Sequence, residues 1–173
     1  MKNGLRFRLK SSGFCEIIGS VIAGLQFTMY LVPSNPVTVS MRKIEHIGIA
    51  VKSLDVSNLV FEKLFGAAPY KMEEVASEGV NTSFFKSGPN NIELLEATNP
   101  ESPIAKFIEK KGEGIHHIAF DVEDIVAEIA RLTQEGFVVL NEIPKKGADN
   151  KLVAFLHPKS TNGVLIELCQ EIV

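Results

Sequence analysis

The stretch Ile44-Glu-His-Ile-Gly-Ile-Ala-Val51 returns in altered form as Ile115-His-His-Ile-Ala-Phe-Asp-Val122. The two copies lie 71 residues apart, and each combines a histidine with the apolar alternation of a half-buried strand. An internal repeat decides the architecture, because each copy is one supersecondary unit that must pack against the other. We therefore expect a chain built from two equivalent modules.

Both strands are followed by the same order of elements. The first helix has Ser53 or Asp55 as its cap and Gly66 at its end, whereas the second is capped by Asp124 and ends at Gly136. Apolar residues recur in the first helix at helical spacing, at Val56, Leu59, Val60 and Leu64. Three β-prone segments follow each helix, at 70–75, 80–86 and 92–96 and again at 137–143, 152–156 and 164–169.

This order predicts an α+β fold made of two tandem βαβββ modules, at about 44–97 and 115–170. We expect the modules to form one cupped, mostly antiparallel sheet with the helices on its outer face. Ser102-Pro103 begins a linker helix that spans 102–112 and joins the modules.

The first forty residues stand apart from this pattern. Basic residues precede an apolar run at 17–32, as in a secretory signal, but no A-x-A-like cleavage site follows. The run of sixteen residues is also shorter than the roughly 20 that span a bilayer. We expect residues 1–40 to be an upstream extension, Met41 to be the native start, and 41–173 to form the single domain.

The composition favours small-molecule chemistry. A net charge of −3 with mixed signs along the chain predicts no nucleic-acid-binding face, and no segment predicts a membrane anchor. The two cysteines, Cys15 and Cys169, lie outside any metal-type spacing, and a reducing, cytoplasmic location fits them.

Face parity selects the candidate site residues. Side chains alternate across a strand, so His46 shares a face with Gly48 and Ala50, while the larger aliphatic residues pack against the helix. His117 lies on the corresponding face of the second copy. Glu93 and Glu167 take that face in the last strand of each module, at separations of 47 and 50 residues from the histidines.

Two modules related by a pseudo-twofold axis would bring the four side chains together. Two imidazoles and two carboxylates suit a divalent metal, and two unpaired carboxylates on an enclosed face would otherwise be costly. The sequence therefore predicts a metal site formed by His46, Glu93, His117 and Glu167. His116 has the opposite parity and is not expected to be a ligand, and His157 is expected to cap a loop.

With these residues assembled, residues 43–171 resemble the methylmalonyl-CoA epimerases of the vicinal-oxygen-chelate (glyoxalase-like) superfamily. The most characteristic stretches are Ser102-Pro-Ile-Ala-Lys-Phe107 and Phe155-Leu-His-Pro-Lys-Ser160 leading into Gly163-Val-Leu-Ile-Glu-Leu168. The resemblance implies epimerisation of (2R)- and (2S)-methylmalonyl-CoA by a homodimer that binds Co²⁺ or Mn²⁺, with Zn²⁺, Ni²⁺ or Mg²⁺ as alternatives. It also implies that His46, Glu93, His117 and Glu167 are the metal ligands.

The chemistry of such an epimerase assigns roles to part of this site. Removing the proton between a thioester and a carboxylate forms an enolate, whose charge a chelating metal stabilises. Glu167 is the candidate catalytic acid/base. Some family members carry a second glutamate where this chain has Thr82, so the second acid/base stays open between water at the metal and another nearby group.

Three other functions compete with epimerisation. A glyoxalase I-type lactoylglutathione lyase uses the same enolate logic, but the tail motif argues against it. An extradiol dioxygenase needs Fe²⁺ with two histidines and one carboxylate, whereas Glu93 adds a fourth ligand. A metal-free binding or resistance protein on the same fold would not need all four ligands. Lys145, Lys146, Lys151 and Lys159 are either phosphate contacts or, as we expect, solvated surface residues.

Overall fold

The computed structural model describes residues 41–172 of the 173-residue chain, so the expectation for 1–40 lies outside the described residues. The first module comprises β1 (Met41–Ala50), α1 (Leu54–Phe65), β2 (Lys71–Val75), β3 (Val80–Ser87) and β4 (Asn90–Ala97). Helix α2 (Pro103–Lys111) connects it to the second module. That module comprises β5 (Gly114–Val122), α3 (Ile125–Gln134), β6 (Lys145–Lys146), β7 (Lys151–Leu156), the short 3₁₀ helix η1 (Pro158–Ser160) and β8 (Leu165–Glu171).

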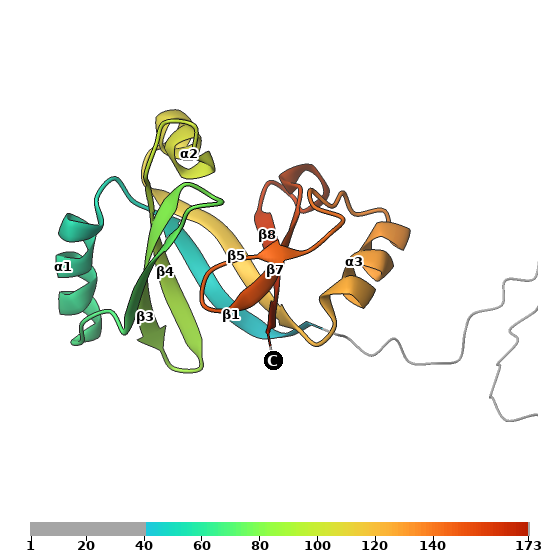
Figure 1. The fold of residues 1–173 in the computed structure, drawn as a ribbon, viewed down its shortest axis with the longest axis horizontal. Helices are drawn as coiled ribbons and strands as arrows, with labels where there is room; N and C mark the ends of the chain where they lie inside the picture. Colours follow the sequence, from blue (N-terminus) through green and yellow to red (C-terminus); the bar gives the residue numbers. More distant parts are fainter. Residues whose placement is uncertain (1–40, 173) are drawn as a thin grey trace, which may run out of the picture. The chain divides into compact units, whose positions relative to one another are not determined.

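All eight strands form one sheet in the order β2-β3-β4-β1-β5-β8-β7-β6 (Figure 1). The β1–β4 and β5–β8 pairs are parallel, and the other five pairs are antiparallel. The modules join through the antiparallel β1–β5 pair at the centre of the sheet. The expected α+β fold with a mostly antiparallel sheet is thus confirmed.

Capping residues define the start of α1 and α3 and the end of α1. The Ser53 side chain accepts a hydrogen bond from Val56 N, and Gly66 ends α1 in the left-handed conformation at φ 70°. Asp124 accepts from the backbone of Val126 and Ala127 and so caps α3. Helices α1 and α3 lie at the two outer flanks of the sheet in Figure 1, each beside the strands of its own module.

Two hydrophobic cores hold these helices to the sheet. In the first module Leu54, Phe61 and Phe65 of α1 pack with Phe85 and Leu94. In the second module α3 packs through Ile125, Ile129 and Leu132 against β7 and β8. The concave side has its own cluster, in which Ile104 and Phe107 of α2 pack with Ala50, Val80 and Leu95.

The apolar residues that recur at helical spacing in α1 face solvent, whereas those of α3 pack in the core. Val56, Leu59, Val60 and Leu64 are 57–69% exposed, so they do not contribute to the core. The buried face instead uses Leu54 and Asn58, with Asn58 accepting a hydrogen bond from Ser83 Oγ at 2.7 Å. Helix α1 is therefore apolar on both faces, and its outer face is unpartnered within the described chain.

The strand expected at 137–143 is wrong. Only Val139 forms a bridge there, with Leu156, and the ladder resumes as the two-residue strand β6 at Lys145. Pro144 has no N–H to donate to a ladder, and the preceding Ile143 is 83% exposed, so its β-branched side chain packs against nothing.

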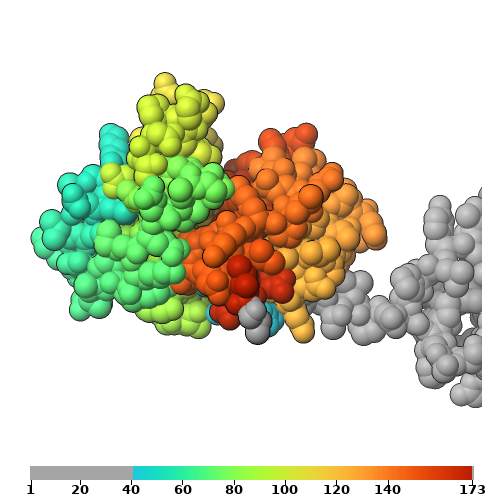
Figure 2. Space-filling model, viewed as in Figure 1, coloured from blue at the N-terminus to red at the C-terminus, as the bar shows by residue number. Residues whose placement is uncertain are grey.

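The two modules also meet through polar contacts at the tips of their hairpins. Lys145 Nζ lies 2.5 Å from Glu78 Oε1, and Lys71 Nζ lies 3.1 Å from Asp149 Oδ1. Figure 2 shows the green first-module segment and the orange second-module segment in contact on this face. Among the described residues, no helix has the length and apolar character needed to cross a membrane.

Candidate metal centre

The four side chains singled out by parity meet in one cavity, which we call the cup. The four central strands β4, β1, β5 and β8 each contribute one of them, in the order Glu93, His46, His117 and Glu167. All four residues are 4–5% exposed and line the cup together with Thr82. Adjacent central strands therefore bring together residues that are far apart in sequence.

Their polar atoms converge within hydrogen-bond distances. His46 Nε2 lies 2.9 Å from His117 Nε2 and 3.2 Å from Glu93 Oε2. His117 Nε2 lies 3.2 Å from Glu167 Oε2 and 3.6 Å from Glu93 Oε2. Ligands about 2.1 Å from a first-row metal ion lie roughly 3 Å from one another, which is the spacing seen here.

A small residue in β1 makes room for the second histidine. The His117 ring lies directly over Gly48, and a Cβ at that position would lie 2.2 Å from His117 Cε1. The matching residue beneath His46 is Ala119, its partner across the β1–β5 ladder. Strand parity predicted that Gly48 lies on this face, and the structure shows that the close approach of His117 requires a glycine there.

The electrostatics of the cup favour a positive charge. Burial alone would lower the pKa of His46, but the carboxylates of Glu93, Glu45 and Glu167 raise it well above 6.5. Burial raises the pKa of Glu167 to about 8. Burial and the neighbouring His46 lower the pKa of His117 well below 6.5. The enclosed carboxylates therefore favour a bound positive charge beside His46, whether a proton or a cation.

The donor set fits a divalent cation. The ligand atoms of His46, His117 and Glu167 all lie within 4.8 Å of one another, and Glu93 Oε2 approaches both histidines. Two imidazole nitrogens and carboxylate oxygens suit Co²⁺, Zn²⁺, Ni²⁺ and Mn²⁺. A cation here would supply the charge that protons otherwise provide, so the predicted ligand set stands as a chemically consistent hypothesis.

Strand parity did not predict where the two residues that precede the histidines lie. The β1–β5 register shifts between Ile44 and His46, which leaves Glu45 as an extra residue in a β-bulge and directs its carboxylate to His46 Nδ1 at 2.5 Å. A second shift lies between Gly48 and Ile49, opposite His116, whose Nδ1 lies 3.0 Å from His117 Nδ1. The repeat could have indicated that these two residues are equivalent, because Glu45 and His116 are also 71 residues apart.

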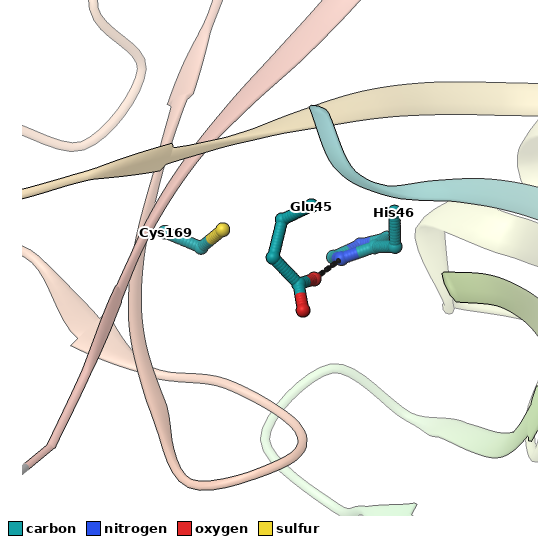
Figure 3. Close-up of side chains that lie close together, drawn as sticks. All are labelled: Glu45, His46 and Cys169. Carbon is teal, nitrogen blue, oxygen red and sulfur yellow. Dashed lines mark hydrogen bonds and ion pairs between the residues drawn. The ribbon is translucent and has the colours of Figure 1, made fainter. Parts of the chain in front are cut away.

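Cys169 lies near Glu45 and His46 but is not a convincing metal ligand (Figure 3). Its thiol donates to Phe120 O at 3.3 Å, and burial raises the thiol pKa above its usual value. The Nδ1 atom of His46 is also engaged, because it is bonded to Glu45. A thiol that keeps its proton is a poor metal ligand, so the Nε2 side of His46 is the better site.

Three other residues from the sequence analysis have defined positions. The Thr82 hydroxyl donates to Glu73 O at 3.1 Å, and Thr82 is 1% exposed in the wall of the cup. His157 accepts from Lys159 N and caps η1, as expected. Lys151 corrects the expectation of a solvated lysine, because it is 6% exposed and lies 3.5 Å from Glu45 Oε1.

Comparisons with known proteins agree with this geometry. Residues 45–155 match the model of the glyoxalase/bleomycin resistance protein/dioxygenase superfamily. The ethylmalonyl-CoA/methylmalonyl-CoA epimerase of Cereibacter sphaeroides is 41% identical, with 74% of this chain and 97% of the relative covered. The uncharacterized protein YqjC of Bacillus subtilis is 38% identical over 75% of this chain and 93% of its own length.

A solved structure extends the comparison to the fold. A variant of Streptomyces coelicolor methylmalonyl-CoA epimerase, in complex with 2-nitronate-propionyl-CoA, superposes with a TM-score of 0.75 at 34% identity. The match covers 78% of this chain and 97% of the epimerase. The chain therefore belongs to the glyoxalase/bleomycin resistance protein/dioxygenase superfamily and, within it, to the methylmalonyl-CoA epimerase family.

Proposed function

We propose that the protein is a metal-dependent methylmalonyl-CoA epimerase that interconverts the (2R) and (2S) forms by removing and returning the α-proton. The convergence of His46, Glu93, His117 and Glu167 in one buried cup carries this proposal. The related epimerases support the substrate class, because the Cereibacter sphaeroides relative is named for ethylmalonyl-CoA and methylmalonyl-CoA and the Streptomyces coelicolor structure contains 2-nitronate-propionyl-CoA.

The four polar side chains are assigned to ligand roles. His46 and His117 would bind through Nε2, and Glu93 and Glu167 through carboxylate oxygens. These residues would hold a divalent ion, which would supply Lewis-acid stabilisation for the oxygen charge that develops when the α-proton leaves. Co²⁺ or Mn²⁺ is our expected ion, with Zn²⁺, Ni²⁺ or Mg²⁺ as alternatives.

The residues around this set suit a small acyl group. Val80, Phe84, Leu95, Val153 and Phe155 line the cup beside the polar atoms. Apolar walls exclude water from the carbon acid and strengthen the electrostatic interactions inside. The substituent on the α-carbon can lie against these walls while the carboxylate and thioester oxygens face the polar cluster.

Glu167 is our candidate for moving the proton. A carboxylate has a second oxygen that can accept a proton while the first binds an ion. A general base must lie within reach of the proton that it removes, and Glu167 lines the same cup as the three other candidate ligands. Inversion requires a second group on the opposite face of the substrate, and Thr82 is too weak a base for that role.

Metal analysis and a chiral assay test this function together. Protein purified without added metal should contain about one equivalent of a first-row ion and should convert (2R)- into (2S)-methylmalonyl-CoA. The hemithioacetal of glutathione and methylglyoxal is the control substrate, and no turnover of it is expected. Turnover of the hemithioacetal without epimerisation of methylmalonyl-CoA would favour a lactoylglutathione lyase instead.

A homodimer is the expected assembly. The outer face of α1 presents Val56, Leu59, Val60 and Leu64 at 57–69% exposure, and contiguous apolar surface of this kind commonly marks an interface. Sedimentation should give a dimer, and Val60→Lys should shift it toward the monomer; a monomeric parent protein contradicts this assembly.

We place the enzyme in the cytoplasm, where the free thiol of Cys169 would stay reduced.

A further inference from the structure

A β-bulge places a carboxylate directly behind the first histidine. Neighbouring residues in a regular strand face opposite sides, but Ile44 pairs with Phe120 and His46 with Ala119, so Glu45 has no partner of its own. Glu45 is 6% exposed, and its Oε2 lies 2.5 Å from His46 Nδ1. Figure 3 shows the carboxylate of Glu45 turned toward the imidazole.

The other side of this carboxylate is held by donors. Asn91 Nδ2 donates to Glu45 Oε1 at 2.8 Å, and Lys151 Nζ lies 3.5 Å from the same oxygen. Asn91 is itself oriented, because its Oδ1 accepts from Lys86 Nζ at 2.9 Å. Oε2 is thereby left to accept from His46 Nδ1–H, and the unprotonated Nε2 of a ligating ring faces the cup.

The second histidine lacks such support. His116 occupies the position equivalent to Glu45, and its Nδ1 lies 3.0 Å from His117 Nδ1. The His116 ring packs edge-on against Phe107, with centroids 5.0 Å apart, and carries no fixed negative charge. The two bulges therefore put chemically different groups behind the two ligands.

We propose that Glu45 is a positioning residue that orients the His46 ring, keeps its hydrogen on Nδ1 and so strengthens its binding to a metal through Nε2. This inference rests on the proposed function insofar as His46 is a ligand. A carboxylate bonded to the remote nitrogen of a ligating imidazole increases the basicity of the metal-binding nitrogen, and losing it typically lowers metal affinity about 10- to 100-fold.

Titration of the metal-free protein with Co²⁺ tests the proposal. Glu45→Ala removes the acceptor, and affinity should fall about 100-fold; Glu45→Gln keeps an acceptor without the charge, and affinity should fall about 10-fold. Glu171→Ala is the matched control, because Glu171 also contacts Lys151, at 3.6 Å, but its side chain is 79% exposed. The control should bind Co²⁺ as the parent does.

Proton NMR of the Co²⁺-loaded proteins adds a readout that general destabilisation would not change. The parent should show two shifted, exchangeable Nδ1–H signals, from His46 and His117, and Glu45→Ala should lose the first through exchange with water. Parent affinity and both signals in Glu45→Ala would overturn the proposal. If that variant does not fold, parent affinity in Glu45→Gln overturns it; if the parent binds no Co²⁺, the proposed function fails instead.

Discussion

The two modules are alike in their candidate ligands and different in what surrounds them. Each supplies one histidine from its first strand and one glutamate from its last, and these four residues meet at the junction of the modules. Behind the histidines, however, stand Glu45 in one module and His116 in the other. Beneath them lie Ala119 and Gly48, respectively.

The candidate chemistry requires only the ligand set of the repeat to be symmetric. Four ligands around one ion need both copies, so histidine and glutamate occupy matching positions. Epimerisation, in contrast, must remove a proton from one face of the substrate and return it to the other, so the two sides of the cup need not match. An asymmetric cup built on a symmetric ligand set is what the proposed reaction calls for.

The largest expected effect comes from removing a ligand of either module. His46→Ala and His117→Ala should each lower kcat/KM at least about 1000-fold, because bound metal contributes several kcal/mol to the transition state. Both variants should stay folded by circular dichroism and lose tight metal binding. Full metal content and turnover in either variant would break the assignment of the site.

The next-largest losses of activity are expected at the two glutamates, and the two losses should differ. Glu167→Gln should lower activity by about 100- to 10,000-fold even when metal is bound, because an amide has no carboxylate to accept the α-proton. Glu93→Gln should cost much less, since the amide oxygen can still serve as a ligand and Glu93 has no proposed role in proton transfer. Kinetics at matched metal occupancy provide the measurement. Equal losses of activity in the two variants would contradict the assignment of Glu167 as the acid/base.

A smaller contrast is expected at the residues beneath the histidines. Gly48→Ala puts a Cβ 2.2 Å from the present position of His117 Cε1, so the ring must turn and Co²⁺ affinity should fall about 10- to 100-fold. Ala119→Gly only frees the backbone and should lower the free energy of unfolding by about 0.5–1 kcal/mol. Co²⁺ titration and urea unfolding distinguish the two. Unchanged affinity in Gly48→Ala would show that the His117 ring can move without loss.

Removal of residues 1–40 should have the smallest effect on activity and stability. A chain that starts at Met41 retains every described residue of the cup and of the two cores that hold α1 and α3, so its kcat/KM and unfolding midpoint should match those of the full chain within error. Activity and thermal melts of the two chains make the comparison. A truncated chain that aggregates or is inactive would mean that residues 1–40 belong to the domain.

The sequence predicted the parts of this structure that repeat and follow regular strand geometry. Parity and repeat position agreed for His46, Glu93, His117 and Glu167, whose side chains do lie together in the structure. Their role as metal ligands stays a prediction. Glu45 was missed because a β-bulge breaks the alternation on which parity depends, and nothing in the spacing of apolar residues reveals a bulge.

Two further differences have local causes. The segment 137–143 has the β-branched composition of a strand, yet Pro144 and the exposed Ile143 prevent a ladder from forming there. Helical spacing in α1 identified an apolar face, but Phe61 and Phe65 on the opposite side are the residues that pack against the sheet. Periodicity shows that a face is apolar without showing what covers it.

The most direct test of the central claim follows the α-proton itself. Metal-loaded protein is incubated in D₂O with each epimer of methylmalonyl-CoA, and deuterium at the α-carbon is followed by NMR, with metal-free protein and His46→Ala in parallel. The account predicts that the loaded parent protein exchanges the α-proton of both epimers and interconverts them, whereas the two controls leave both unlabelled. Equal exchange in the metal-free protein, or no exchange in the loaded one, would contradict it.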